Sequence, residues 1–306
     1  MKWIALAIKI KLMKLFIFTA VSFISLIALY AFKQPKKAIV SLKDMKKVLK
    51  AGYCYVPSGS LIMNGDTVSC QGFFMRNTEV TNFDYKEYLY QLKNKGDLDA
   101  YKKALPDSTK WINQVSGGEK MKDHYFSHPV YNYYPVVNLT YEQAEAYCDW
   151  LSEVWQQNTG NKSIRFRLPL QAEFLKAAYG TDLERPYSWK GPYLRDNKGL
   201  FMANFIHVGE GAITRGKDGK LEVKPSQIFN GYNCTDLMAA AKSYSPNELG
   251  LYNLNGNVAE MVAEKGKAVG GSWNSPGYDI RNTSVEEFTT ANPKVGFRPV
   301  MTFVGK

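Results

Sequence analysis

The sequence predicts a single large α+β domain of irregular build over residues 52–304, with few helices, short strands and long loops. Three stretches carry a clear helical pattern, and the remaining apolar and aromatic segments are short. Glycine, asparagine and proline separate these segments, and the 306 residues include 24 glycines and 13 prolines. Few helices, many short segments and abundant turn residues are typical of an α+β domain rather than of a bundle or a barrel.

The first half of this domain is predicted to open with two strands and a helix. Residues 53–60 form a strand and a turn, and residues 72–80 form a second strand. Thr81 precedes a helix over residues 82–92, because its hydroxyl can accept a free amide hydrogen of the first turn. The polar and aromatic stretch 93–134 predicts a long loop packed by its own aromatic side chains.

Two further helices follow. Thr140 and Gln143 have the spacing of a capping box. Apolar residues then recur at helical intervals, at Ala144, Tyr147, Cys148, Leu151, Val154 and Trp155. Cys148 lies on this stripe, so we expect an inert core thiol there rather than a functional one. The next helix is predicted to begin at Pro169, a residue suited to a first helical turn, and to end at Gly180.

The positive charge of the chain is concentrated at its N-terminus. The formal net charge is +11, yet residues 1–50 hold eleven of the 39 basic residues and only one acidic residue, Asp44. The remaining 28 basic and 27 acidic residues nearly balance. Because a nucleic-acid-binding domain carries its basic patch on the folded body, we expect no nucleic-acid partner.

Residues 15–32 form an uncharged apolar segment of membrane-spanning length. A basic segment, residues 1–14, precedes it, and a lysine-rich linker, residues 33–51, follows it. Eighteen helical residues span about 27 Å, close to the roughly 30 Å hydrocarbon core of a bilayer. No good cleavage motif follows the segment, so a removed signal peptide and a retained anchor both stay open. Either way we expect export to the periplasm or cell envelope, with membrane anchoring through residues 15–32.

The cysteines fit an exported protein but do not decide its redox state. Cys54 and Cys70 lie in two predicted strands that a hairpin could bring together. A disulfide closing a loop of about 15 residues would stabilise the fold by about 3 kcal/mol; two free thiols are the alternative. Cys234 has no evident partner, and no Cys-x-x-Cys spacing indicates a structural zinc site.

Several familiar catalytic motifs are missing. The chain contains no His-Glu-x-x-His, no P-loop and no Gly-x-Ser-x-Gly. His124 and His128 have the i, i+4 spacing of a helical metal site, but Pro129 disfavours a helix there. We therefore expect these histidines to lie on the surface or to pack within the loop.

Eight sequence blocks occur in the order found in one known family. They are VPSGS (56–60), NTEVTN (77–82), YPVV (134–137), AEAYCDW (144–150), RLPLQAEF (167–174), GLYNLNGNVAEM (250–261), AVGGSWNS (268–275) and VGFRPV (295–300). On these blocks the chain resembles the formylglycine-generating enzyme, or sulfatase-modifying factor, family. The resemblance implies that the α+β domain is of the C-type-lectin-like kind.

The resemblance also implies a copper site whose thiols this chain lacks. In active members, two cysteines after the Gly-Gly-Ser motif bind copper, and the site oxidises a substrate cysteine to an aldehyde. The matching positions here are Ser275 and Ile280, while Ser272 of the pocket is retained. Isoleucine cannot hold a metal, and a serine hydroxyl is a poor ligand for soft copper(I). We therefore expect no catalytic residue and no copper, and hence a pseudoenzyme. The alternative is a formylglycine-generating-type oxidoreductase, or another modifying enzyme, with a non-standard active site.

Calcium is the cofactor that the resemblance implies for this chain. Asn253, Gly256, Val258 and Glu260 match the family's second calcium site, and all-oxygen ligation with one carboxylate suits this hard ion. The alternative for this loop is a glycine turn with a capping asparagine. The residues that match the first site are Asn204, Phe205 and Asn233, with Asp236 as an alternative to Asn233. An asparagine in place of a carboxylate is expected to weaken that first site.

An insertion resembles one branch of the family. The blocks LPDSTKW (105–111) and YFSHPVY (125–131) are similar to those of its gliding-motility and type IX secretion lipoproteins, although no lipobox cysteine is present. Those members use the fold as a structural part of an envelope assembly. The resemblance implies a binding or scaffold role, with envelope proteins or peptides as partners. Trp111 and residues 125–134 form the candidate contact surface, because aromatic side chains are enriched at interface hot spots; a self-packed loop is the alternative.

Overall fold

The computed structural model describes residues 42–112, 114–115, 117–206, 213–219, 221–223 and 237–304. The helices and 3-10 turns are α2 (Leu42–Lys50), α3 (Asn82–Asn94), α4 (Leu98–Ala104), η1 (Ser108–Trp111), α5 (Gly118–His124), η2 (Pro129–Tyr131), α6 (Tyr141–Thr159) and α7 (Gln171–Tyr179). The strands are β1 (Tyr53–Val56), β2 (Gly59–Met63), β3 (Asp66–Cys70), β4 (Phe73–Arg76), β5 (Ile164–Arg167), β6 (Ile213–Arg215), β7 (Leu221–Val223), β8 (Ala259–Met261), β9 (Lys267–Val269), β10 (Val285–Glu287), β11 (Val295–Phe297) and β12 (Val300–Phe303).

Two small sheets organise the domain. One has the order β1-β4-β12-β5 and the other the order β10-β9-β8-β11, in which β11 runs parallel to β8. The hairpins β2–β3 and β6–β7 form separate two-stranded sheets. Strands β4 and β12 pair although more than 200 positions separate them in sequence, so the last strand ties the two ends of the body together. The short strands and mixed elements confirm the predicted α+β class.

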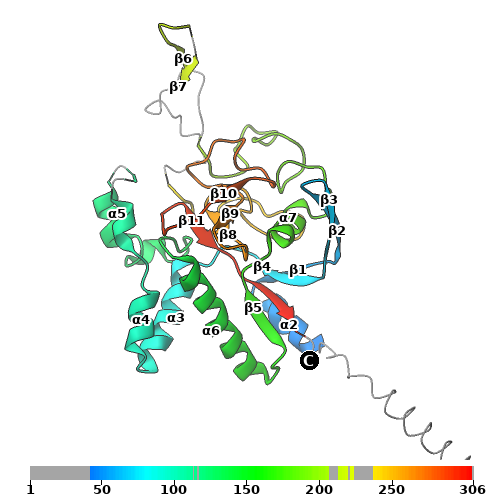
Figure 1. The fold of residues 1–306 in the computed structure, drawn as a ribbon, viewed down its shortest axis with the longest axis vertical. Coiled ribbons are helices and arrows are strands. Elements are labelled where there is room, and N and C mark those ends of the chain that lie inside the picture. Colours follow the sequence, from blue (N-terminus) through cyan, green and yellow to red (C-terminus); the bar gives the residue numbers. More distant parts are fainter. Residues whose placement is uncertain are drawn as a thin grey trace, which may run out of the picture.

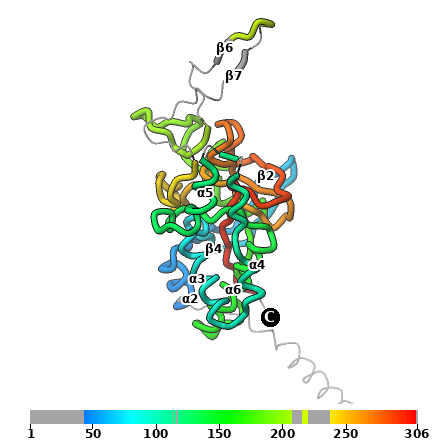
Figure 2. Tube along the Cα trace, turned by 90° about the vertical axis from the view of Figure 1, so that its left-hand side faces the viewer, coloured from blue at the N-terminus to red at the C-terminus, as the bar shows by residue number. Residues whose placement is uncertain are grey.

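Helices α3, α4 and α6 lie together at one end of the body, and the loops of residues 250–290 lie at the other (Figures 1 and 2). The helical end is packed by aromatic rings: Tyr85 stacks on Tyr147, and Tyr88 lies against Trp150. The predicted N-cap at Thr81 and the predicted capping box of Thr140 and Gln143 are both present, and Asp84 completes a second capping box at the start of α3. Cys148 is buried in this core as predicted, and burial raises the pKa of its thiol well above the ordinary value.

The N-terminal part of the described chain packs on the body. Val48 of α2 is wholly buried in the main apolar core, and the Asp44 carboxylate accepts a hydrogen bond from Asn161 Nδ2 at 3.1 Å. The predicted linker, residues 33–51, therefore includes a docked helix from residue 42. The predicted segments 1–14 and 15–32 lie outside the described residues. Among the helices that are described, none is long and apolar enough to cross a membrane.

Cys54 and Cys70 do not form the possible disulfide: both are free thiols, and their strands do not pair with each other. Strand β1 pairs with β4, which places Cys54 opposite Met75. Cys70 instead lies opposite Gly59 in the β2–β3 hairpin. The two cysteines therefore belong to different sheets. Cys234 lies outside the described residues.

The third helix begins slightly later than predicted. Pro169 precedes α7 rather than occupying its first turn, and Leu170 is the N-cap residue. The Glu173 carboxylate accepts a hydrogen bond from the Leu170 backbone amide at 2.8 Å, which supplies the cap that leucine's side chain cannot. The helix ends before Gly180, as predicted.

The stretch 93–134 contains more helix than predicted, since α4, η1, α5 and η2 all lie within it. Trp111 and Tyr125 are almost wholly buried, with ring centroids 4.9 Å apart. His124 ends α5 and His128 caps η2, and both are exposed, as predicted. The described residues contain no group of three or more histidines, cysteines or acids arranged to hold a metal.

Candidate functional site

The positions that match the family's copper site lie on a loop between β9 and β10. Gly271 of this loop has φ +68°, and a Cβ there would lie 2.4 Å from the Asp279 carbonyl oxygen, so only glycine fits. Ser275 Oγ accepts a hydrogen bond from the Ser272 amide at 3.0 Å and lies 3.3 Å from Ser272 Oγ. Both serines are buried. The two hydroxyls thus satisfy one another within a tight turn.

Ile280 is wholly buried in an apolar cluster with Tyr187, Phe201, Ala203 and Phe205. Its backbone carbonyl accepts a hydrogen bond from Asn255 Nδ2 at 2.7 Å. The isoleucine side chain therefore contributes to packing and supplies no polar atom.

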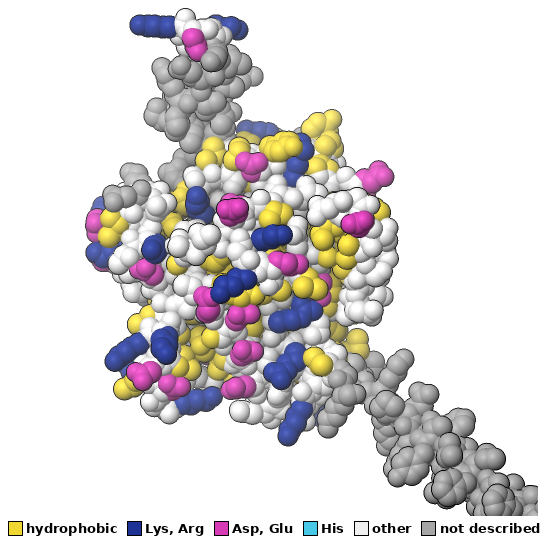
Figure 3. Space-filling model, viewed as in Figure 1, with side chains coloured by type: hydrophobic (Ala, Val, Ile, Leu, Met, Phe, Trp, Pro, Cys, Tyr) yellow, Lys and Arg dark blue, Asp and Glu magenta, His cyan; other side chains and the backbone are white. Residues whose placement is uncertain are grey.

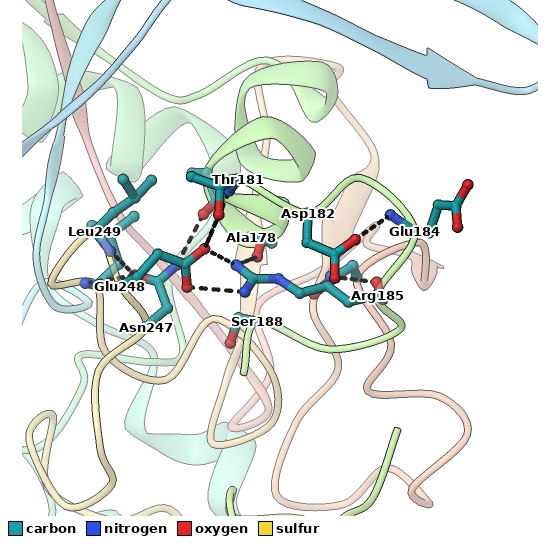
Figure 4. A network of polar contacts seen from close by, with 12 residues as sticks. Ala178, Thr181, Asp182, Glu184, Arg185, Ser188, Asn247, Glu248 and Leu249 are labelled. Carbon is teal, nitrogen blue, oxygen red and sulfur yellow. Dashed lines mark hydrogen bonds and ion pairs between the residues drawn. The ribbon is translucent and has the colours of Figure 1, made fainter. Parts of the chain in front are cut away.

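A polar network joins the loop that follows α7 to residues 247–249 (Figure 4). The Arg185 guanidinium contacts both Glu248 carboxylate oxygens, at 2.9 and 2.7 Å, and donates to the Ala178 carbonyl at 3.0 Å. Arg185 also presents its backbone carbonyl to Asn282 Nδ2 at 3.1 Å, and Asn282 in turn contacts Asn255 at 3.0 Å. These contacts fix residues 280–282 against the 181–188 loop. The sequence alone indicated no role for Arg185, Glu248 or Asn255.

A cavity of about 460 Å³ opens beside Ser275. Its charged and aromatic lining comes from Tyr278, Asp279, Arg281 and Glu286. The Arg281 guanidinium lies 4.0 Å from the centroid of the Tyr278 ring. Burial raises the pKa of Glu286, and the nearby Asp279 adds to this increase. The described lining is therefore polar and carries both signs of charge.

The residues at this cavity do not fit copper. Copper(I) prefers thiolate ligands, whereas the described lining offers the Ser275 hydroxyl and the carboxylates of Asp279 and Glu286. Ile280 packs among apolar side chains at the second thiol position. Ser275 and Ile280 thus provide no thiolate at the two positions where the resemblance implies cysteines.

The loop that matches the second calcium site is buried and built from left-handed residues. Asn253 has φ +51°, Gly256 φ +75° and Asn257 φ +62°, a conformation that asparagine and glycine tolerate best. A Cβ on Gly256 would lie 2.3 Å from the Asn204 carbonyl oxygen. That oxygen accepts a hydrogen bond from the Asn257 amide at 2.7 Å. The two segments predicted to hold calcium therefore lie against each other.

Glu260 forms a buried ion pair that the sequence did not predict. The Arg298 guanidinium contacts Glu260 Oε1 at 2.6 Å and Oε2 at 3.0 Å, and both side chains are almost wholly buried. Glu79, also wholly buried, accepts a hydrogen bond from Asn257 Nδ2 at 2.7 Å. Burial raises the pKa of Glu79; the charge of Arg298 opposes this increase, and Glu260 adds to it. Arg298 is thus ion-paired with Glu260, and its charge also acts on Glu79 without a direct contact.

These residues fit calcium in their chemistry. Asn253 Oδ1 is buried and has no hydrogen-bond partner among the described residues, and calcium is held by amide, carboxylate and backbone oxygens. Gly256 and Val258 would supply backbone carbonyls. A carboxylate has about four acceptor positions, so Glu260 can bind an ion while it is paired with Arg298.

The first predicted calcium site is only partly described. Asn204 is wholly buried and its Nδ2 donates to the Leu237 carbonyl at 2.6 Å. Phe205 is buried in the apolar cluster around Ile280. Asn233 and its alternative Asp236 lie outside the described residues, so this site stays a prediction.

The candidate contact surface needs correction. Trp111 and Tyr125 are buried with Val137, Met238 and Trp273, so they cannot meet a partner. Within that insertion, Tyr133 is 69% exposed, and it stacks on the exposed ring of Phe83 with centroids 6.2 Å apart. The self-packed alternative therefore describes most of the insertion.

Phe83 and Tyr133 border a groove of about 690 Å³. The groove lies between the end of α2, the start of α3 and residues 240–243. Lys50 and Lys242 also line it, and neither forms an ion pair with an acid in the described parts of the chain. On the molecular face in Figure 3, by contrast, basic and acidic side chains are interspersed.

The fold and the loop beside Ser275 together define a protein of the sulfatase-modifying factor class. Its domain model, described as "Sulfatase-modifying factor enzyme 1-like domain", matches residues 36–303. The chain belongs to this family.

The named relatives agree with this membership. The chain is 25% identical over 248 residues to the formylglycine-generating enzyme of Mus musculus, a match that covers 75% of this chain and 55% of that protein. It is 28% identical over 156 residues to the formylglycine-generating enzyme of Streptomyces coelicolor, covering 50% of this chain and 37% of that protein. The chain thus spans about half, or less, of the length of these relatives.

Solved structures share the fold. The crystal structure of CarF superposes with a TM-score of 0.54 at 19% identity, covering 82% of this chain and 98% of CarF. The structure of PvdO from Pseudomonas aeruginosa gives a TM-score of 0.50 at 17% identity, covering 81% of this chain and 93% of PvdO.

Proposed function

We propose that this protein is a non-catalytic, calcium-stabilised member of the family that serves as a binding or scaffold component of the cell envelope. One observation carries the proposal: Ile280 is wholly buried among apolar side chains at a position where active members need a thiolate. The other position holds Ser275, whose hydroxyl is paired with Ser272. Without thiolates the site cannot bind copper(I) as active members do.

The proposed placement rests on the N-terminal sequence and on the insertion. The apolar segment 15–32 with its basic flanks supports export and membrane anchoring. The blocks at 105–111 and 125–131 support a place in a secretion or gliding-motility assembly. The cavity beside Ser275 remains large enough to bind a peptide segment, because loss of a metal ligand does not fill a cavity.

One observation favours a second function. The relatives that match are named formylglycine-generating enzyme, and the cavity at the matching position is open. An oxidase with an unrecognised ligand set would explain both features.

An aldehyde assay separates the two functions. The full chain, loaded with copper(I), is incubated with a cysteine-containing sulfatase peptide, and the peptide mass is measured. We expect no aldehyde above the enzyme-free control and no stoichiometric copper, because Ser275 and Ile280 provide no thiolate.

The double variant Ser275→Cys/Ile280→Cys is the matched control. It restores both thiols, so we expect it to bind about one copper(I) ion per chain with thiolate ligands. Aldehyde formed by the unmodified chain would establish the oxidase and end the non-catalytic proposal.

We further propose that the groove beside Phe83 and Tyr133 binds an acidic segment of an envelope protein. Two exposed aromatic rings offer a hot spot of the kind found at interfaces, and Lys50 and Lys242 add uncompensated positive charge. Replacement of Tyr133 by a photo-crosslinking phenylalanine derivative should therefore capture one discrete partner in intact cells. The partner is identified by mass spectrometry.

Tyr90 provides the control position, because it is similarly exposed, at 65%, but does not line the groove. Crosslinking at Tyr133 should also weaken in a Lys50→Glu/Lys242→Glu background. Equal crosslinking from both tyrosines, or no discrete product from Tyr133, would refute the groove as the contact surface.

A further inference from the structure

Glu79 is a buried carboxylate outside the residues that the sequence assigned to calcium. It follows β4 in the chain and is wholly buried. Its carboxylate accepts hydrogen bonds from Asn257 Nδ2 at 2.7 Å and from Asn253 Nδ2 at 3.3 and 3.4 Å. One carboxylate thus holds two asparagine side chains of the candidate calcium loop.

These contacts fix the orientation of the Asn253 side chain. A side-chain amide has two N–H donors and one carbonyl acceptor. Asn253 Nδ2 donates to Glu79 and to the Ala241 carbonyl oxygen, the latter at 3.2 Å. A flipped amide would place Oδ1 against these two acceptors, which is repulsive. The oxygen must therefore face the opposite side, where it is buried and where the described part of the chain offers it no donor.

A bound cation accounts for the orientation of Asn253 Oδ1 better than an unpaired acceptor does. An unpaired buried acceptor costs about 1–3 kcal/mol. The surroundings also hold little positive charge, because Arg298 is the one cation of the described residues that acts on both Glu79 and Glu260. A hard cation beside Asn253 Oδ1 would satisfy the oxygen and balance the buried charge at once.

Asn257 connects the same carboxylate to the next segment. Its Oδ1 accepts a hydrogen bond from the Ala239 amide at 2.7 Å, while its Nδ2 donates to Glu79. Asn257 therefore has both ends satisfied by protein groups, whereas Asn253 has only its nitrogen satisfied. Of the two asparagines, Asn253 is the one poised to bind an ion.

We propose that Glu79 is a positioning residue of the calcium site: it accepts an amide hydrogen of Asn253 so that Oδ1 faces the ion, and it adds a second carboxylate charge nearby. This inference rests on the calcium site of the proposed function. It extends that site to a residue 174 positions away in sequence.

The test measures calcium affinity of the full chain by calorimetry after chelator treatment. Glu79→Gln replaces an acceptor by a donor opposite Asn253 Nδ2 and removes one charge. We expect the calcium Kd to rise about 10–100-fold, the loss usual when a residue that orients a metal ligand is replaced. Glu173→Gln is the matched control, because Glu173 is also a buried glutamate but contacts Arg167 and Leu170 instead. Its calcium Kd should not change.

A second variant distinguishes positioning from a general effect on folding. Glu79→Gln/Asn253→Asp exchanges donor and acceptor and keeps the net charge, and an aspartate presents an oxygen in either orientation. We expect its calcium Kd to return to within about 10-fold of the unmodified chain.

The possible outcomes distinguish the role of Glu79 from the existence of the calcium site itself. If the unmodified chain binds calcium and Glu79→Gln binds it equally well, the role of Glu79 is refuted while the site stands. Failure of the folded double variant to recover affinity refutes the positioning role as well. If the unmodified chain binds no calcium, both the calcium site and the role of Glu79 are refuted.

Discussion

Replacement of Arg298 by leucine is expected to lower the free energy of unfolding by about 3–5 kcal/mol. The guanidinium is wholly buried and donates to Glu260 and to the backbone carbonyls of Arg76, Asn77 and Tyr252. Its removal leaves those carbonyls without donors and leaves two buried carboxylates without their shared cation. Urea denaturation monitored by tryptophan fluorescence, in excess chelator, measures the change.

Arg165 provides the control, because it is an exposed arginine on β5. Arg165→Leu should change the unfolding free energy by no more than about 0.5 kcal/mol. The double variant Arg298→Leu/Glu260→Leu should be less destabilised than Arg298→Leu alone, because it removes one of the stranded carboxylates. An Arg298→Leu protein as stable as the unmodified chain would show that this buried pair does not form.

The second large effect is expected at Gly256. Gly256→Ala should destabilise the fold by about 3 kcal/mol, combining about 1–2 kcal/mol of left-handed backbone strain with about 1–3 kcal/mol of overpacking. A Cβ at this position would lie 2.3 Å from the Asn204 carbonyl oxygen. A backbone atom cannot rotate away as a side chain can, so the two segments must separate. Thermal and urea denaturation measure the effect.

Gly65 is the control position that separates the cost of backbone strain from the cost of the steric clash at Gly256. It has φ +90°, close to that of Gly256, and a Cβ there would meet no atom within 4 Å. Gly65→Ala should therefore cost only the backbone term, about 1–2 kcal/mol. Similar losses for both variants would mean that residues 204 and 256 are not in close contact.

Features that depend on neighbours in sequence were predictable. The capping boxes of α3 and α6 involve residues three positions apart, and both form. The buried stripe of α6, with Cys148 on it, follows from helical periodicity alone. The family blocks also identified Ser275 and Ile280 as the positions to inspect; Ser275 lines the cavity, and Ile280 lies in the neighbouring apolar cluster.

Features that depend on strand pairing were not predictable. A hairpin through residues 57–59 suggested that Cys54 and Cys70 meet, but β1 pairs with β4, so the cysteines lie in different sheets. Similarly, aromatic composition suggested an exposed contact surface at Trp111, and only the packing against Met238 and Trp273 shows that this residue is covered.

The sequence by itself determined the fold class, the main helices with their caps, the family, and the absence of thiols at positions 275 and 280. Only the tertiary structure decided which groups surround the candidate calcium loop. Glu79, Asn253, Glu260 and Arg298 come from three distant parts of the chain, and each residue type alone is unremarkable. Local patterns arise from interactions along one element, whereas the charge balance of a buried cluster depends on which elements pack together.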